Sequence, residues 1–248
     1  MKKISLITIA VSTAIASFGS LANQNENITS FNKAKKLLLS EVYSITGKTT
    51  VYCHGSFTDN KTFIAPKGFE SSKYPKRQKR IEFEHITAAE NFGRAIVPNE
   101  WNNGHPKCVT SSGKQYKGRR CAAKVSDEYK RAEADMHNLY AANGAVNALR
   151  SNYNFVMLPS SKSSFGSCDM RIEGSKAQPP ELARGVIARA HMYMEYAYPR
   201  FKMSSSQSKL MKAWDKQYPV TAEECSRYKI IDKIQGSKNI ILASRCTS

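Results

Sequence analysis

The sequence predicts an α+β fold, and three observations lead to that prediction. Short segments with the β-branched, aromatic or alternating composition of strands lie early in the chain, as at Ile81–Ile86. Apolar residues recur at helical spacing late in the chain, most clearly over Glu181–Tyr198. The sequence shows no internal repeat at a fixed period. Strands gathered early and helices gathered late are typical of α+β proteins.

The first 22 residues have the composition of a secretory signal peptide. Lys2 and Lys3 supply a positive start, and Ile4–Phe18 is an apolar run broken by small polar residues. Ser20 and Ala22 place small residues where a signal peptidase cleaves. The run is too short, and too rich in Ser and Thr, to be a good membrane span. We therefore expect cleavage after Ala22.

Cleavage would leave residues 23–248, a length typical of one domain. No later stretch approaches the length of a transmembrane helix, so we expect no membrane span and a soluble mature chain. The formal net charge is +18, and loss of Lys2 and Lys3 lowers it to +16. The basic residues spread along the mature chain. Such a charge attracts polyanions, which favours nucleic acid over the alternatives of solubility or anionic surfaces.

The first half of the mature chain carries the predicted strands. Ser30 is placed to cap a helix that runs through Ser40 or beyond. Thr49–Cys53 is predicted to be a strand, with Thr62–Ala65 as its partner. Residues 71–80 form a basic, polar connection. A second short strand follows at Ile81–Ile86, where apolar and polar residues alternate.

The middle of the chain is less regular. Pro98–Arg120 is rich in Pro, Gly, Ser and Asn and is predicted to be a long loop, a kind of segment that is usually functional or cross-linked. Ser126–Met136 is predicted to be a short charged helix, and Asn143-Gly144 is a turn signal. Val146–Phe155 is predicted to open another helix or a loop.

The last third is predicted to be helical. A helix over Glu181–Tyr198 is followed by another over Ser206–Tyr218, which Pro219 ends. Thr221 and Glu224 have the spacing of a capping box for a further helix.

All six cysteines lie after the predicted signal peptide, at Cys53, Cys108, Cys121, Cys168, Cys225 and Cys246. An even number of cysteines in an exported chain predicts disulfide bonds. Short spacing favours Cys108–Cys121 and Cys225–Cys246, which leaves Cys53–Cys168 as a long-range bridge. Structural zinc is the alternative, and the lack of any C-x-x-C spacing in the sequence argues against it.

The pair Glu84-His85 at the end of a predicted strand has the chemistry that phosphodiester hydrolysis needs. Histidine can deprotonate water near neutral pH, and a carboxylate can hold a hard cation that neutralises phosphate charge. Neighbours on a regular strand point to opposite faces, so the two share a site only if the strand ends or bends there. Taken alone, the pair is more often an exposed strand segment.

The sequence resembles the bacterial periplasmic endonuclease I family, whose members carry the ββα-metal nuclease motif. The resemblance runs from about Ser30 to Cys246. In chain order, the matching stretches are Arg80–His85 with Phe92-Gly93, Glu133–Leu139, Gly144–Asn152, Pro179–Gly185, Ala188-Arg189, Ala213-Trp214, Tyr218–Thr221, Glu224-Cys225 and Gln235-Gly236. So many matches in one order are far more specific than any one of them.

The resemblance implies roles for individual residues. His85 would be the general base that activates water, and Glu84 and Asn147 would be the metal ligands. The expected metal is Mg²⁺, with Mn²⁺ or Ca²⁺ as substitutes. An arginine near the end of the predicted loop would face the phosphate, and Arg119 is the candidate with Arg120 as the competitor.

The resemblance also implies a substrate and a location. The substrate would be double-stranded DNA cut without sequence preference, with single-stranded DNA and RNA as further substrates, because phosphate contacts carry no base information. The products would carry 5′-phosphates. The protein would be a monomer in the periplasm or outside the cell.

The chain departs from the family pattern at several positions. Phe83 stands where the family has Trp, Ala88 where it has Pro, and Ala148-Leu149 where it has Gly-Asp. Family members often have eight cysteines, and here His54 and the Ser71-Ser72 region lie near the two missing positions. The changes after Asn147 motivate an alternative, a basic nucleic-acid-binding envelope protein that is impaired in cutting. A protein that binds lipopolysaccharide or phospholipid head groups is a third possibility.

Other polar and aromatic residues receive weaker expectations. His137 is expected to be a supporting or structural residue, and Arg150 and Asn152 are expected to brace the site or touch phosphate. Trp214 and Tyr193 are expected to be core residues.

Overall fold

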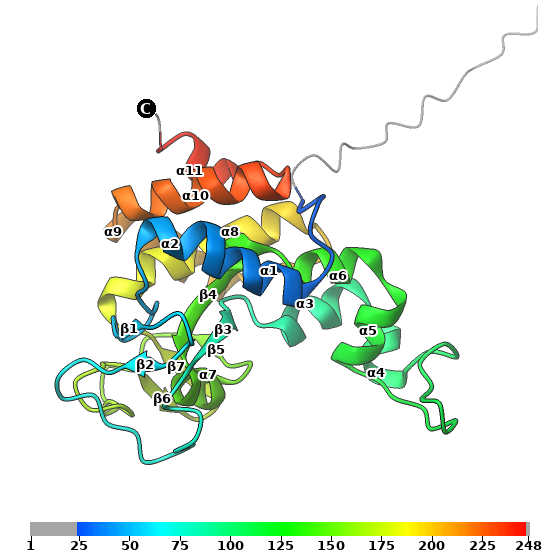
Figure 1. Ribbon diagram of the computed structural model, residues 1–248, viewed down its shortest axis with the longest axis horizontal. Coiled ribbons are helices and arrows are strands. Elements are labelled where there is room, and N and C mark those ends of the chain that lie inside the picture. The colour runs from blue at the N-terminus through cyan, green and yellow to red at the C-terminus, as the bar shows by residue number, and fades with distance from the viewer. Residues whose placement is uncertain (1–23, 247–248) are drawn as a thin grey trace, which may run out of the picture.

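A two-stranded antiparallel sheet lies at the centre of the molecule (Figure 1). The computed structural model describes residues 24–246, so the predicted signal peptide and its cleavage point lie outside the described residues. The sheet pairs β3 (Ile81–His85) with β4 (Leu139–Asn143), and α7 (Gly144–Arg150) follows β4 directly. This β-strand, β-strand, helix order confirms the α+β prediction and is consistent with a ββα core.

One face of the sheet is apolar. Ile81 and Phe83 of β3 are buried on this face together with Ala141 and Leu139 of β4, and Phe83 pairs with Ala141. They pack against α1 (Phe31–Leu37), the π-helical turn η1 (Leu38–Val42), α2 (Tyr43–Thr46) and α10 (Ala222–Gln235). Figure 1 shows α1, α2 and α10 above the sheet. Ser30 caps α1 as expected, since its hydroxyl accepts a hydrogen bond from the Lys33 amide.

The other face of the sheet carries the alternate residues of β3, Glu82 and Glu84, and faces α7. Behind α7, the core contains Ala145 and Val146 together with Ile187 of α8 (Arg184–Ala197). Because a strand exposes alternate residues on opposite faces, this arrangement places the acidic side chains of β3 against the helix that follows β4.

A helical insertion connects β3 to β4. It contains α3 (Ala89–Ile96), α4 (Pro98–Asn103), α5 (Arg119–Val125), α6 (Asp127–Glu133) and the 3₁₀ turn η2 (Met136–Asn138). Phe92 and Tyr129 of the insertion pack against Tyr193 of α8. The insertion therefore rests on the end of β3 and on the most buried helix of the molecule.

The remaining elements cover the two ends. The other bounds are β1 (Ser56–Phe57), β2 (Phe63–Ile64), β5 (Asn154–Phe155), β6 (Arg171–Glu173), β7 (Lys176–Gln178), η3 (Glu181–Ala183), α9 (Ser205–Gln217) and α11 (Ile240–Ala243). β1 pairs with β2, and β5, β7 and β6 form a three-stranded sheet in that order. The late helices expected at 181–198 and 206–218 are confirmed as η3 with α8 and as α9.

Two expectations about the early and middle chain are wrong in part. Thr49–Cys53 is not a strand: Thr49 makes a single bridge to Ser56, and the chain turns over residues 51–53. The partner of β2 is β1 instead. The predicted loop Pro98–Arg120 begins as α4, because Pro98 is well suited to the first position of a helix. It ends in the first turn of α5.

The capping box at Thr221 is also half correct. The Thr221 hydroxyl accepts from the Glu224 amide, as expected. The Glu224 carboxylate does not return to Thr221 but forms a buried ion pair with Arg189, with its oxygens 2.6 and 2.7 Å from the guanidinium nitrogens. A buried carboxylate without a cation costs free energy of folding, so the Glu224 carboxylate pairs with the Arg189 guanidinium.

Three disulfides tie the fold together. The bridges are Cys53–Cys168, Cys108–Cys121 and Cys225–Cys246, which is the pairing expected from spacing. The first joins the turn after α2 to the segment before β6. The second joins the segment between α4 and α5 to α5 itself. Within residues 24–246, no helix has the length and apolar character of a membrane span.

Candidate nuclease site

His85 is the last residue of β3, and its ring lies between the hairpin and the helical insertion. The ring centroid is 4.9 Å from that of Phe31 and 5.9 Å from that of Phe92. Its Nε2 lies 2.8 Å from the backbone carbonyl of Glu133. A carbonyl only accepts, so Nε2 carries the proton and Nδ1 keeps its lone pair.

The environment of His85 favours the neutral imidazole. Burial and, after it, the positive charge of Arg119 together lower the pKa of His85 to about 3, against the opposing hydrogen bond to Glu133. The side chain is 6 % exposed. A neutral, oriented imidazole with a free Nδ1 is a proton acceptor.

Arg119 lies next to His85 because both side chains form hydrogen bonds to Glu133. The Glu133 carboxylate accepts from Arg119 Nε at 2.5 Å, while its carbonyl holds the histidine. The guanidinium also lies over the Phe31 ring, 5.1 Å from the centroid. Arg120, the competitor, instead lies over Tyr116 at 4.2 Å. The structure therefore places Arg119, at the start of α5, beside the histidine.

Glu84 points to the opposite face of β3. Its Oε1 accepts from the Tyr52 hydroxyl at 2.7 Å and from Arg150 Nη1 at 2.9 Å. Burial raises the pKa of the Glu84 carboxyl, and the Arg150 charge opposes that rise. The carboxylate is 3 % exposed, and the nearby guanidinium offsets part of its desolvation.

Asn147 lies on the same side of the hairpin, in the middle of α7. Its Nδ2 donates to Glu82 Oε2 at 3.0 Å, and Glu82 is in turn held by Arg77 and Arg80. Because the amide nitrogen is engaged, Oδ1 is the atom left to accept or to bind a cation.

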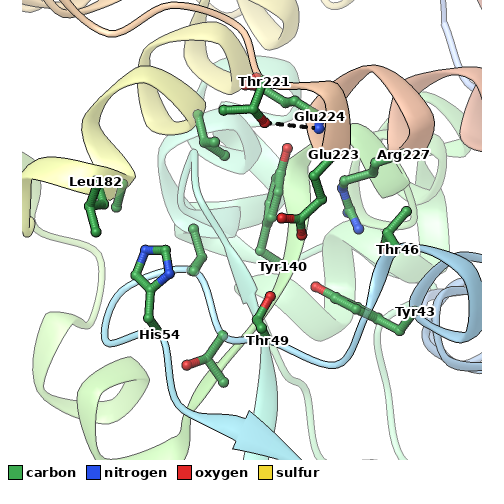
Figure 2. A pocket seen from close by; sticks show the side chains of 14 residues that line it. Tyr43, Thr46, Thr49, His54, Tyr140, Leu182, Thr221, Glu223, Glu224 and Arg227 are labelled. Atoms are coloured by element: carbon green, nitrogen blue, oxygen red, sulfur yellow. Dashed lines mark hydrogen bonds between the residues drawn. The ribbon is translucent and has the colours of Figure 1, made fainter. Parts of the chain in front are cut away.

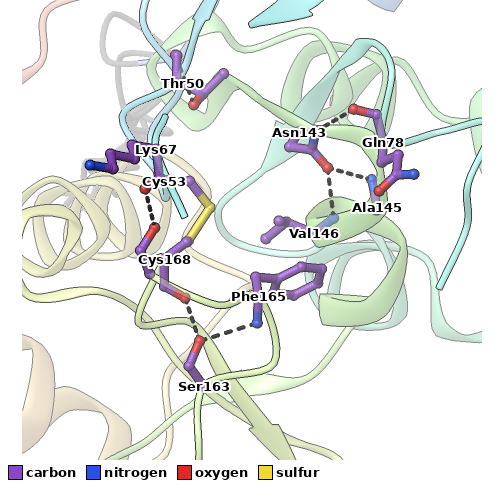
Figure 3. The surroundings of a disulfide bond; sticks show 12 residues. Thr50, Cys53, Lys67, Gln78, Asn143, Ala145, Val146, Ser163, Phe165 and Cys168 are labelled. Atoms are coloured by element: carbon purple, nitrogen blue, oxygen red, sulfur yellow. Dashed lines mark hydrogen bonds between the residues drawn. A yellow bond between two sulfur atoms is a disulfide. The ribbon is translucent and has the colours of Figure 1, made fainter. Parts of the chain in front are cut away.

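Asn143 fixes where α7 starts. Its side-chain oxygen accepts from the amides of Ala145 and Val146, and its nitrogen donates to the Gln78 carbonyl (Figure 3). The expected turn at Asn143-Gly144 is therefore the junction between β4 and α7, and Asn143 is its N-cap.

Arg150 connects the two sides of β3. It is 1 % exposed, donates to Glu84 and to the carbonyls of His85 and Ile86, and packs on Phe155. It braces the site and is too buried to face a phosphate. Within residues 24–246, the structure records no direct contact of the His85 ring with the side chains of Glu84 or Asn147.

The other sequence candidates lie in structural positions. His137 is buried and pairs with Asp232 at 2.8 Å, and Trp214 and Tyr193 are buried in the core. Asn152 is half-buried, and its carbonyl accepts a hydrogen bond from Asn91.

A cavity of about 130 Å³ lies away from these residues. Figure 2 shows that Tyr43, Tyr140 and Arg227 border it, with Glu223 and His54 at its sides. Its lining includes neither His85 nor the proposed metal ligands.

Three residues of the site had no assigned role before the structure. Glu133 orients both His85 and Arg119, Tyr52 bonds Glu84, and Glu82 bonds Asn147. The alternation of β3 could have indicated Glu82, since residues two apart on a strand share a face. Nothing in the local sequence indicates that a carbonyl 48 residues away would hold His85.

Comparison with known proteins identifies the family of the chain. Residues 23–243 match the family model described as Endonuclease I. An extracellular deoxyribonuclease of Aeromonas hydrophila is 34 % identical over 228 residues, covering 89 % of this chain and 91 % of the relative. Endonuclease-1 of Buchnera aphidicola subsp. Baizongia pistaciae is 32 % identical over 243 residues, covering 92 % and 91 %. A periplasmic deoxyribonuclease of Aeromonas hydrophila is 33 % identical over 205 residues, covering 80 % and 79 %. With its strand–strand–helix core, its buried histidine and these relatives, the chain belongs to the endonuclease I family.

Proposed function

We propose that the protein is an exported endonuclease that hydrolyses DNA without sequence preference, with His85 as general base and one divalent metal ion. The observation that carries this proposal is the neutral, oriented His85 held beside Arg119 through Glu133. The names of the relatives, which include extracellular and periplasmic deoxyribonucleases, support the substrate and the export.

His85 supplies the first step, in which its Nδ1 takes a proton from the attacking water. The Glu133 carbonyl accepts from Nε2–H, which fixes the tautomer and leaves the lone pair on Nδ1. The low pKa of the ring keeps it unprotonated at neutral pH. A base of this kind contributes about 10²–10⁴ in rate.

Arg119 supplies charge to the phosphate. Its Nε donates to Glu133, and the guanidinium also lies close enough to the Tyr129 hydroxyl to oppose the rise in the pKa of that group. We assign the terminal NH₂ groups to the phosphate. Arginine binds phosphate oxygens through such paired donors, and the bonds strengthen as negative charge develops on them.

Glu84 and Asn147 fit the role of ligands to a hard cation. Both recorded hydrogen bonds to Glu84 within residues 24–246 go to Oε1, and the Asn147 amide is oriented with Oδ1 free. One carboxylate oxygen and one amide oxygen suit Mg²⁺, which keeps several waters, and Mn²⁺ or Ca²⁺ would be the substitutes. Among the described residues, no group of three or more His, Cys, Asp or Glu side chains could hold a metal ion, so the proposed site would use two protein ligands and complete its coordination with water and phosphate.

When bound, such an ion supplies Lewis-acid stabilisation of the phosphate and of the departing 3′-oxygen. The products would then carry 5′-phosphates. Double-stranded DNA is the main proposed substrate, with single-stranded DNA and RNA as further ones, and the enzyme is proposed to act as a monomer.

The test is cleavage of supercoiled plasmid by the oxidised protein with magnesium, with a chelator, and after His85→Ala. We expect cutting with magnesium only, and a loss of at least about 10²-fold in the variant. His54→Asn is the matched control, because His54 is exposed and lines a cavity that includes neither His85 nor the proposed metal ligands. Full activity of His85→Ala, or cutting in chelator, contradicts the mechanism.

The changes after Asn147 motivate the competing function, a DNA-binding protein that no longer cuts. In the structure, Ala148 and Leu149 are half-buried on α7, and Asn147 keeps its orienting bond. Salt-sensitive plasmid binding without cleavage in any divalent metal would favour that function.

A further inference from the structure

The ring of Phe31 gathers two cations at the candidate site. It contacts His85 at 4.9 Å between centroids, while Arg119 lies 5.1 Å and the Lys35 ammonium 4.5 Å from its centroid. Phe31 and Lys35 are four residues apart on α1, so they lie on the same face of the helix. Lys35 is therefore on the face of α1 that meets the histidine.

The charge of Lys35 is poorly compensated. Among the ion pairs of residues 24–246, none includes Lys35, although Glu133 lies close enough to raise its pKa. Partial burial, followed by the charges of Lys61 and Arg119, lowers the pKa of Lys35. A cluster of like charges next to a buried base is costly unless an anion neutralises it.

Building on the proposed function, we infer that Lys35 binds a backbone phosphate of the nucleic acid adjacent to the one held at His85 and Arg119. It is a substrate-positioning cation of this site, placed by the ring that also supports the histidine. An ammonium is a compact charge that suits a second phosphate, while the guanidinium of Arg119 makes the paired contact.

Lys36 offers a matched control one residue along the same helix. Lys35 is half-buried against Phe31, while Lys36 is exposed and lies about 100° round the helix from it. Lys35→Gln and Lys36→Gln remove the same charge from the same helix. Any difference between them therefore reports position and not net charge.

The first experiment measures binding of a short DNA duplex in the His85→Ala background, by fluorescence anisotropy over a range of salt concentrations. Each lost phosphate contact lowers the slope of log K against log salt by about 0.9. We expect Lys35→Gln to weaken binding about tenfold and to lower the slope by about one, with a change of less than about twofold for Lys36→Gln. Lys35→Arg should restore most of the slope.

The second experiment measures plasmid or oligonucleotide cleavage in the active protein. Loss of a phosphate contact made equally in ground and transition states raises KM and leaves kcat near its original value. If Lys35 only supported Phe31 and His85, Lys35→Gln would lower kcat and leave the salt slope unchanged, and the inference would be wrong. Equal effects of the two Gln variants would also overturn it. Both results leave His85-dependent cutting intact, so they are distinct from failure of the proposed function.

Discussion

Neighbouring residues at the end of β3 show how strongly a side chain depends on the face it occupies. Glu84 and His85 are adjacent, yet one bonds Tyr52 and Arg150 on the α7 side and the other bonds Glu133 on the α1 side. Both are buried, and burial shifts each pKa toward its neutral form. For His85 this keeps the ring unprotonated at neutral pH, whereas the Glu84 carboxylate needs a cation or guanidinium to stay charged.

The buried pair of Glu84 and Arg150 gives a prediction at this scale. Arg150→Met keeps much of the side-chain volume but leaves the carboxylate buried without its guanidinium, which typically costs about 3–5 kcal/mol. Urea unfolding should show this loss in the single variant. Glu84→Gln in the same chain should recover part of it, because the uncompensated charge is gone. A double variant that is no more stable than Arg150→Met would contradict this account.

The helix α8 illustrates how one element combines packing with buried polar groups. Arg189 holds Glu224 and Asp215, while His191 is 4 % exposed and has Nδ1 3.0 Å from the Ile187 carbonyl. Figure 1 shows α8 passing behind the central hairpin, where it contributes to the cores on both sides of the molecule.

His191 predicts a pH dependence of stability. Burial lowers its folded-state pKa to about 4, well below the ordinary value of 6.5. As the pH falls, His191 takes up a proton in the unfolded chain before it does so in the folded protein. Its contribution to the free energy of unfolding is therefore complete above about pH 6.5 and is lost between about pH 6.5 and 4. Between pH 7 and pH 5 this histidine accounts for about 2 kcal/mol of lost stability.

The comparison is with His191→Gln, by urea unfolding at the two pH values. The variant should lose less stability than the parent over this interval, although it is less stable at pH 7. His85 titrates in both proteins and cancels in the difference. An identical pH dependence of the two proteins would show that His191 is protonated or solvated in the fold.

At the scale of the whole molecule, the packed residues within 24–246 form three separate core clusters, and the disulfides add covalent links between distant segments of the chain. Cys53–Cys168 closes a loop with a sequence separation of 115, whereas Cys108–Cys121 closes one of 13. In the chain-entropy model, a longer closed loop removes more freedom from the unfolded chain.

Paired replacement by serine should therefore rank the bridges. We expect Cys53→Ser with Cys168→Ser to cost about 5 kcal/mol, and Cys108→Ser with Cys121→Ser about 3 kcal/mol. Thermal and urea unfolding of the two double variants measures the difference directly. The shorter bridge lies next to Arg119. Its loss should therefore reduce the rate of DNA cleavage by more than the loss of folded protein accounts for. The reverse order of stabilities would mean that native packing, and not loop length, dominates.

Several elements escaped prediction because their signals are not local. β4 has the sequence Leu-Tyr-Ala-Ala-Asn, and alanine has little strand preference, so it is a strand only because β3 pairs with it. Thr49–Cys53 has the opposite character, a strand-like composition in a turn whose last residue is tied by a disulfide to Cys168. In both cases a partner distant in the sequence outweighs the intrinsic preference of the residues.

Local order and spacing were enough to identify the α+β class, the late helices, the cysteine pairs and the family, with His85, Glu84 and Asn147 among its motif positions. The sequence favoured Arg119 but kept Arg120 as a competitor, and it gave Glu133 no role. The tertiary structure distinguishes the two arginines, because the insertion between β3 and β4 packs so that Glu133 contacts both His85 and Arg119. Contacts between residues far apart in the chain depend on how helices pack, and no local pattern encodes that.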